Sequence, residues 1–311
     1  MELYGYFLYS TSLLTMAGIY AVMTLGLNVQ WGFAGLFNVG IAGFFAIGAY
    51  VSAILTTAVT PEHLGGFELP FMVGIIAAMI ISALVALPIG LLCVRLRSDY
   101  LAISTIGIAE ILRLILKNEV WATNGARGIS LIPQPFTFMG VPYDRIFYMF
   151  AVFLAVAILY FLFERARISP WGRVMTAIRE NEVAARAMGK DVDRLRVQSF
   201  VLGSAAMGLA GAFMAHYIKF IGPQATEPHT TTFLVWVMLI MGGSGNNRGA
   251  ILGALILWVV WSVTEIFTAK LPPELAIQAS YIRMFLIGLV LQIILQKFPQ
   301  GILPERRSYD H

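Results

Sequence analysis

The residues with the types and spacing for chemistry are few in this chain, and most are charged rather than nucleophilic. Glu110 and Arg113 stand three residues apart within an apolar run at 101–117, so on a helix they share one face and can pair. An ionised side chain at the centre of a membrane helix costs at least about 2.5–3.5 kcal/mol. If this run crosses a membrane, the two residues must face a bundle interior or a cavity. They would then form either a fixed ion pair or part of a gate or solute contact.

No residue set for enzyme catalysis or metal binding is evident in the sequence. The single cysteine, Cys93, excludes an intrachain disulfide and a thiolate metal site. A phosphate loop is also absent, because Gly189-Lys190 is followed by Asp191 and lacks the earlier glycine. We therefore expect a protein that is not an enzyme and that binds no metal or cofactor itself. Four histidines lack the helical spacing of metal ligands, and we expect structural or idle roles for them: His63, His216, His229 and His311.

A charged stretch, RENEVAARAMGKDVDRLR at 179–196, interrupts a chain with 59% hydrophobic and only 12% charged residues. Ser169 and Pro170 are typical of a helix start, as N-cap and first helical position. The pattern over 171–189 predicts one amphipathic helix that ends at Gly189. Its apolar stripe comprises Val174, Ile178, Ala185 and Met188.

The insert at 164–196 continues after this helix. Asp191 can cap a second short helix over 192–198 that leads into the next apolar run. The insert is either a solvated connection or a rigid protrusion that a soluble partner binds. Long structureless connections are uncommon, and this one has helix signals throughout, so we favour the second interpretation.

Long apolar runs must position these charged residues. An uncharged run of such length spans a hydrocarbon core, and its backbone must satisfy its hydrogen bonds internally, so each run is a helix. We expect an all-α polytopic membrane protein, a single transmembrane domain over 1–311 with eight or nine transmembrane helices, including broken or re-entrant Gly-rich segments. The runs are approximately 8–27, 33–59, 72–94, 101–117, 146–163, 197–218, 233–241 continuing into 249–268, and 282–296.

Fourteen of the 21 lysines and arginines fall in alternate loops that the positive-inside rule places in the cytoplasm. The insert and the C-terminus would then be cytoplasmic, and nine spans would place the N-terminus outside. The N-terminal segment lacks the basic region of a signal peptide, and its tyrosines suit a membrane interface. The cytoplasmic set is Arg95, Arg97, Arg165, Arg167, Arg173, Arg179, Arg186, Lys190, Arg194, Arg196, Arg248, Lys297, Arg306 and Arg307. The opposite set is Lys117, Arg127, Arg145, Lys219 and Lys270.

Three Gly-rich segments are candidates for transport roles. The span at 31–50 is a weak continuous helix, and its Asn38, Gly40 and Gly43 serve either close helix packing or a broken helix beside a solute pathway. The outer loop at 118–145 contains turns at Asn124, Gly125 and Gly128, and is either a plain connection or part of an outer gate. The segment 242–254 favours helix packing through Gly249 and Gly253, after a turn at 246–248.

The stretch SPWGRVMTAIRENEVAARAMG resembles the cytoplasmic coupling loop of ABC-importer permeases. Its Glu182, Ala184, Ala185 and Gly189 match the loose pattern Glu-x-Ala-Ala-x-x-x-Gly. Taken together, the chain resembles the membrane subunits of the branched-chain (hydrophobic) amino acid ABC importers, although Ala126-Arg127 departs from the family's Gly-rich outer turn. The other matching stretches are GLFNVGIAGFFAIGAY, STIGIAEILRLILKN, MGGSGNNRGAILGA and FPQGILP.

The resemblance implies partners and a membrane. It implies a prokaryotic inner (cytoplasmic) membrane, a second and often non-identical permease subunit, two cytoplasmic ATPase subunits that use ATP and Mg²⁺, an external solute-binding protein, and no nucleic acid. The implied substrates are leucine, isoleucine and valine. Urea, short amides and other amino acids are alternatives within the family pattern, and an ion-coupled secondary transporter or a passive facilitator are alternatives from other classes.

The resemblance also implies two groups of site residues. The first couples 164–196 to the ATPases, and the second lines or gates the pathway. The coupling residues are Arg173, Arg179, Glu180, Asn181, Glu182, Ala184, Ala185, Met188 and Gly189. The pathway residues are Asn38, Gly40, Gly43, Glu110, Arg113, Asn124, Gly125 and Gly128.

Overall fold

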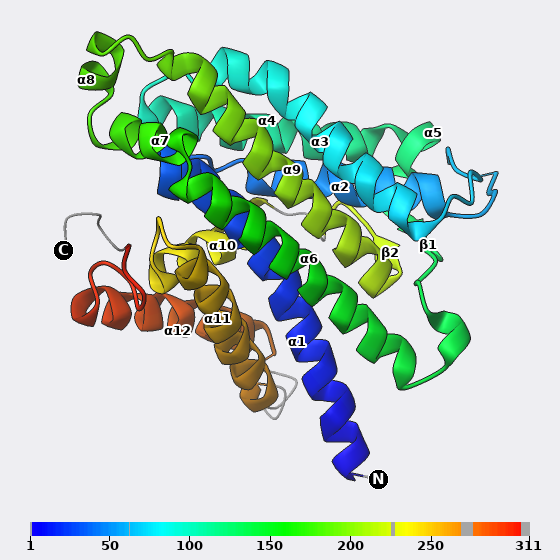
Figure 1. Cartoon of the computed structure of the whole chain (residues 1–311). Coiled ribbons are helices and arrows are strands. Elements are labelled where there is room, and N and C mark those ends of the chain that lie inside the picture. Colours follow the sequence, from blue (N-terminus) through cyan, green and yellow to red (C-terminus); the bar gives the residue numbers. More distant parts are fainter. Residues whose placement is uncertain (1, 62, 225–227, 269–275, 306–311) are drawn as a thin grey trace.

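The computed structural model describes residues 2–61, 63–224, 228–268 and 276–305, and helices dominate it (Figure 1). The two strands, β1 (Ile129–Ser130) and β2 (Phe220–Ile221), have two residues each, so the all-α class is confirmed. Some residues named from the sequence lie outside the described ranges: Lys270, Arg306, Arg307 and His311.

Twelve α-helices are described. Five segments are long and apolar enough to cross a membrane: α1 with the π-helix η1, α3, α6, α9 and α11. Shorter apolar helices cover 41–56, 231–242 and 285–297. These features support a polytopic membrane protein, and the number of eight or nine crossings stays a prediction. The helices are α1 (Glu2–Leu27), η1 (Asn28–Phe33), α2 (Ile41–Thr56), α3 (Phe71–Cys93), α4 (Ser98–Asn118), α5 (Val120–Thr123), α6 (Tyr143–Ile168), α7 (Pro170–Glu180), α8 (Glu182–Ala187), α9 (Val192–Ile218), α10 (Pro228–Gly242), α11 (Asn247–Thr268) and α12 (Ala276–Lys297), with 3₁₀ turns η2 (Gly125–Arg127) and η3 (Thr137–Met139).

The Gly-rich span is broken in the structure. The helix α1 widens into the π-helix η1, and the chain then leaves helical geometry at 35–40 before α2 begins. Gly35 has φ +68°, a conformation that favours glycine. The predicted break in this span is therefore confirmed, although its contact with a solute stays a prediction.

Small residues also allow close packing of this span against its neighbours, as the helix-packing interpretation expected. A Cβ added to Gly48 would lie 2.0 Å from the carbonyl oxygen of Gly208, and one added to Gly211 would lie 1.9 Å from that of Phe45. The backbones of α2 and α9 are therefore in direct contact, which small residues permit in a membrane interior. The helix α3 packs on the same pair, where Ser82 Oγ donates to the Phe44 carbonyl at 3.3 Å.

The predicted packing role of the 242–254 segment is confirmed. The glycines Gly249 and Gly253 of α11 lie against Gly242 of α10, where an added Cβ would stand 2.6 Å from the Gly242 carbonyl oxygen and 2.9 Å from its Cα, respectively. The turn between the helices occupies 243–246 rather than the predicted 246–248, because α11 already begins at Asn247. This pair of antiparallel helices therefore forms one closely packed hairpin.

The charged loops gather at one end of the molecule. In Figure 1 the helices α7 and α8 lie at one end of the molecule, and α5, β1 and β2 lie at the opposite end. Arg95 after α3 pairs with Asp193 at the start of α9 at 3.2 Å, and Lys219 stands at the other end, beside β2. The described members of the two sets of basic residues that the sequence analysis assigned to opposite sides of a membrane thus lie at opposite ends of the described structure.

The α2–α9 contact makes a stability prediction with a matched control. Gly211→Ala places a methyl group against the α2 backbone, so we expect the stability of the chain to fall by about 1–3 kcal/mol. Gly107→Ala on α4 meets nothing within 4 Å and should be neutral or slightly stabilising. Thermal unfolding of both variants in the same detergent checks this, and equal melting temperatures would contradict the packing argument.

Candidate functional site

The insert contains two helices where the sequence predicted one. The predicted helix over 171–189 is wrong at its middle, because the chain leaves helical geometry at Asn181 (φ −151°) and separates α7 from α8. The Asn181 side chain accepts a hydrogen bond from the backbone N–H of Ala184 at 3.0 Å. Asparagine offers the backbone such local bonds, and here it caps a new helix rather than continuing the first.

The other boundaries of the insert follow the prediction, with one exception. The Ser169 side chain caps α7, with Pro170 in its first turn, and the Asp191 side chain accepts from the N–H of Arg194 at 3.1 Å. Gly189 has φ +74° at the turn. The exception is the predicted short second helix at 192–198, which forms the first turns of α9 and runs without a break to Ile218.

The helix α7 has two different faces. Its inner face is buried through Gly172, Met175 and Ile178. Its outer face, together with α8, surrounds an open hollow of about 580 Å³ that solvent reaches. The hollow is lined by Pro170, Arg173, Val174, Ala177, Glu180, Asn181, Ala184, Ala185, Met188 and Lys190.

Most of the predicted apolar stripe is confirmed. Ile178 and Ala185 are buried together with Val192, and Val174 packs against this cluster. Met188 is the exception, because 80% of its surface is exposed. It lies one residue beyond the end of α8, with φ −81° and ψ 13°, outside the helix that places Ala185 in the stripe. The insert therefore presents an exposed apolar side chain that its own packing does not need.

Ion pairs fix α8 on the start of α9. Glu182 pairs with Arg186 at 2.9 Å and with Arg196 at 2.8 Å, and Arg186 also pairs with Asp193 at 2.5 Å. Hydrogen bonds to Asp193 and Glu182 raise the pKa of the Arg186 guanidinium above its ordinary value. The Glu182 carboxylate, which the sequence placed near an ATPase contact, thus joins α8 to the start of α9.

Arg179 points inward rather than into the hollow. Its guanidinium donates to the backbone carbonyl of Gly32 in η1 and, at 2.7 Å, to the Glu305 carboxylate. At helical spacing it shares a face with Met175 and Gly172, which are buried. The sequence expected Arg179 beside Glu180 and Asn181 at one contact, and the structure separates it from them.

The break in the Gly-rich span is lined by polar groups that bond within the protein. Asn38 is fully buried, and its Nδ2 donates to Gln30 Oε1 at 2.8 Å while its Oδ1 accepts from the Gly40 N–H at 2.8 Å. The indole of Trp236 donates to the Asn38 carbonyl at 3.1 Å, and Thr105 Oγ1 accepts from the Val39 N–H at 3.0 Å. Asn38 therefore supports the break in this conformation, and solute contact by its side chain stays a prediction.

The pathway residues Gly40 and Gly43 meet α4. An added Cβ would lie 2.7 Å from the Thr105 carbonyl oxygen at Gly40 and 3.0 Å from Ala109 Cα at Gly43. Glu110 follows Ala109 directly. The structure thus brings the start of α2 within one residue of the predicted ion pair on α4.

The Glu110–Arg113 pair forms as the spacing predicted. Arg113 Nε donates to Glu110 Oε2 at 2.8 Å, and a second bond joins Nη2 to Oε1. The side chains are 41% exposed at Glu110 and 20% at Arg113. The pair is therefore only partly enclosed by this chain. The helix α4 is not among the segments that are long and apolar enough to cross a membrane, so the predicted position of the pair near the membrane centre stays a prediction.

The outer-loop residues lie at the opposite end and form one anchored turn. Asn124 adopts a left-handed conformation (φ 60°), and its Nδ2 donates to the Gly128 carbonyl at 3.0 Å. A Cβ on Gly128 would lie 2.3 Å from the Ile221 carbonyl oxygen, so glycine allows β1 to pair with β2. Buried His216 of α9 bonds the Pro133 carbonyl at 2.7 Å, a structural role of the kind the sequence predicted.

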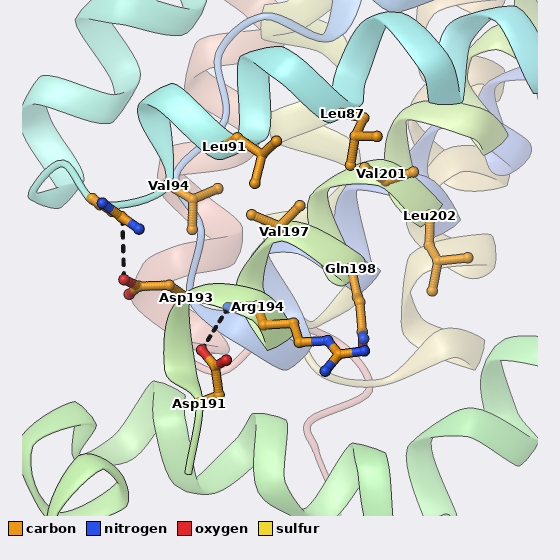
Figure 2. Close-up of a pocket in the computed structure, with 11 residues that line it drawn as sticks. Leu87, Leu91, Val94, Asp191, Asp193, Arg194, Val197, Gln198, Val201 and Leu202 are labelled. Atoms are coloured by element: carbon orange, nitrogen blue, oxygen red, sulfur yellow. Dashed lines mark hydrogen bonds and ion pairs between the residues drawn. The ribbon is translucent and has the colours of Figure 1, made fainter.

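A second hollow, of about 640 Å³, lies between the end of α3 and the start of α9 (Figure 2). It has an apolar side formed by residues such as Leu91 and Val197, and a charged end where Arg194 extends towards Gln198. None of the site residues predicted from the sequence lines it. The predicted site residues lie instead in and next to α7 and α8, at the break and the start of α2, on α4, and in the turn at 124–128.

Sequence reasoning missed a chain of buried amides at the insert's end of the molecule. Asn28 Nδ2 donates to Asn247 Oδ1 at 2.9 Å, and Asn247 Nδ2 donates to Glu164 Oε2 at 2.9 Å. Asn28 Oδ1 accepts from the Gly245 N–H at 2.8 Å. The signal was present, since Asn28 and Gln30 are amides next to apolar runs, but the sequence does not name their partners.

The cap at Asn181 makes a local prediction. Removing a side-chain cap destabilises a helix by about 1 kcal/mol, so Asn181→Ala should speed amide exchange in α8 about fivefold. Asn181→Asp keeps the accepting oxygen and serves as the matched control. Hydrogen exchange read by mass spectrometry over 182–188 checks this, and equal exchange in both variants would show that the cap is unimportant.

Comparisons with known proteins agree with the ordered motifs. A family model described as branched-chain amino acid transport system / permease component matches residues 9–295. The high-affinity branched-chain amino acid transport system permease protein LivM of Salmonella typhimurium is 32% identical, over 96% of this chain and 71% of the relative. The probable LivM of Methanocaldococcus jannaschii is 29% identical, over 93% and 91% of the two chains.

A more distant relative and the solved structures complete these findings. The permease protein LivH of Salmonella typhimurium is 25% identical over 93% of this chain and 92% of the relative. No solved structure matches the chain significantly. The family model covers far more than half of the chain and includes both the broken span and the whole insert at 164–196. The chain therefore belongs to the family of branched-chain amino acid transport system permease components.

Proposed function

We propose that this chain is a permease subunit of an ATP-driven ABC importer and forms part of the membrane pathway for leucine, isoleucine and valine. Its membership of the permease family carries this proposal. Relatives named LivM and LivH are both similar to it, which supports a second, non-identical permease as partner. The assembly would also contain two ATPases that use ATP and Mg²⁺, and an external solute-binding protein.

The outer face of α7 and α8 suits an ATPase subunit. The hollow there combines apolar side chains with charged ones, and Val183 and Met188 expose most of their surface beside it. Exposed apolar groups rimmed by polar ones mark protein interaction sites. Since Glu182 pairs with Arg196, a force on α8 would be passed to the start of α9.

The pathway would lie beside the broken span and α4, next to the second permease. The partly exposed Glu110–Arg113 pair supports this, because water in a pathway or a partner surface would remove the cost of exposing it to lipid. Asn38, Gly40 and Gly43 would shape its inner part, and the turn at 124–128 its outer mouth. A lining of small and apolar residues tolerates a hydrophobic solute side chain, so the external binding protein would select the solute.

The orientation follows from charge. The insert, the α10–α11 turn and the C-terminal segment would face the cytoplasm, because the basic residues concentrate there. The outer loop and the N-terminus would then face outward, in a prokaryotic inner membrane. Docking of ATPases on α7 and α8 requires the same orientation.

Uptake by the complete importer in proteoliposomes tests the proposal. We expect leucine to accumulate against its gradient only when the ATPases and ATP are present, and unlabelled leucine to compete far better than urea. Competition by urea instead would assign the chain to a related permease with another substrate. Accumulation without the ATPases would support an ion-coupled transporter, and equilibration without ATP a facilitator.

The docking face makes a second prediction with a matched control. Val183 in α8 and Val59 after α2 are equally exposed, at 77% and 76%, but belong to opposite ends of the chain. We expect Val183→Asp to reduce the amount of ATPase that copurifies with the permease about tenfold, because a carboxylate replaces an apolar contact. Val59→Asp should leave this amount unchanged. Equal effects would show that the ATPases do not bind α8.

A further inference from the structure

The side chain of Arg179 joins α7 to two other parts of the molecule. Its Nη1 donates to the Gly32 carbonyl, and its Nη2 donates to the Glu305 carboxylate at 2.7 Å. The two charged side chains are only 23% and 24% exposed. Charge-assisted bonds in such a sheltered position are stronger than those of exposed surface pairs.

The Gly32 carbonyl needs this donor because of the break. In a continuous α-helix it would accept from the N–H of Leu36, four residues on. Here the Leu36 N–H donates to the Gln30 carbonyl at 2.9 Å, as the π-helix ends. Arg179 supplies a hydrogen bond that the broken span does not supply itself. The helix α7 therefore forms a hydrogen bond, through Arg179, with the backbone just before the break.

Glycine residues lie around the contact between Arg179 and Glu305, so the backbone approaches it closely. A Cβ added to Gly35 would lie 3.1 Å from Arg179 Cγ, and one added to Gly245 would lie 2.8 Å from Glu305 Oε2 and 3.1 Å from Arg179 Nη1. Three elements thus close on one guanidinium: the break, the α10–α11 turn and the C-terminal segment. Any displacement of Arg179 meets backbone on several sides.

Glu305 is itself held in place by α10. The N–H groups of Ile302 and Leu303 donate to the carbonyls of Met241 and Gly242, each at 2.9 Å. These are terminal carbonyls of α10, which lack partners within the helix. The segment 302–305 is therefore docked along the end of α10, and its carboxylate has a defined position opposite Arg179.

We propose that Arg179 is a positioning residue that transmits movement of α7 to the break in the Gly-rich span, and that Glu305 holds Arg179 in the conformation seen here. The inference rests on the proposed function, in which ATPases move α7. When α7 moves, the Gly32 carbonyl must follow Arg179 or find a new donor, because an unpaired buried carbonyl is costly. Either response changes the geometry of 35–40, beside α4.

The test uses the complete importer in proteoliposomes, with three quantities measured: copurified ATPase, ATP hydrolysed, and leucine transported. For Arg179→Ala we expect normal copurification and hydrolysis, and at least tenfold less leucine transported per ATP. Arg165→Ala, which removes an exposed arginine from neighbouring α6, is the matched control and should behave as the unmodified importer.

Two further variants separate coupling from folding. Arg179→Lys keeps the positive charge, but one ammonium cannot reproduce the forked contact with both acceptors, so we expect partial recovery, to within about threefold of the unmodified ratio. Glu305→Gln keeps the Gly32 contact and should lower the ratio about two- to threefold. In Arg179→Ala the Glu305→Gln change should add nothing, because both act through one contact.

Two results would overturn the inference. An unchanged ratio of transport to hydrolysis in Arg179→Ala would show that the junction transmits nothing. Loss of copurified ATPase from Arg179→Ala and Arg179→Lys, with melting temperatures preserved, would make Arg179 a docking residue instead. Failure of the proposed function is distinguishable, because the unmodified importer would then show no ATP-dependent uptake.

Discussion

A backbone group within a membrane protein must find its hydrogen bond inside the protein, and this requirement organises the structure around the break at 35–40. The break leaves carbonyl and amide groups without helical partners. Asn38 serves the Gly40 N–H from within the break, Thr105 and Trp236 serve other groups from α4 and α10, and Arg179 serves the Gly32 carbonyl. Several polar side chains of this apolar chain therefore lie where the helix is interrupted.

The same requirement explains why distant segments meet at the two ends. The terminal carbonyls of α10 accept from the C-terminal segment, and β1 pairs with β2 to join the outer loop to the end of α9. Each junction brings together parts far apart in sequence. The central helices α2, α3 and α9 combine close backbone contact through glycines with polar bonds such as Ser52–His216 and Ser82–Phe44.

Features set by neighbouring residues could be predicted from the sequence, and features set by distant partners could not. The caps at Ser169 and Asp191, the turn at Gly189 and the Glu110–Arg113 pair depend on residues within four positions. Asn181 is a residue type that favours a helix cap over a helix interior. It was nevertheless predicted to lie within a helix, because the residues on both sides of it are good helix formers. The inward orientation of Arg179 depends on Gly32 and Glu305, both more than 100 residues away, and no local pattern shows them.

The direct contact of α2 with α9 also excludes one conduit. A single methyl group on Gly48 or Gly211 would already overlap the facing helix, so no molecule of amino-acid size slips between these two helices in this conformation. On another side α2 packs on α4 at Gly40 and Gly43, and it is the Glu110 face of α4 that this chain leaves partly uncovered. Cross-linkers and blocking reagents meant to trap a solute in transit should therefore be attached along α4 rather than along α9.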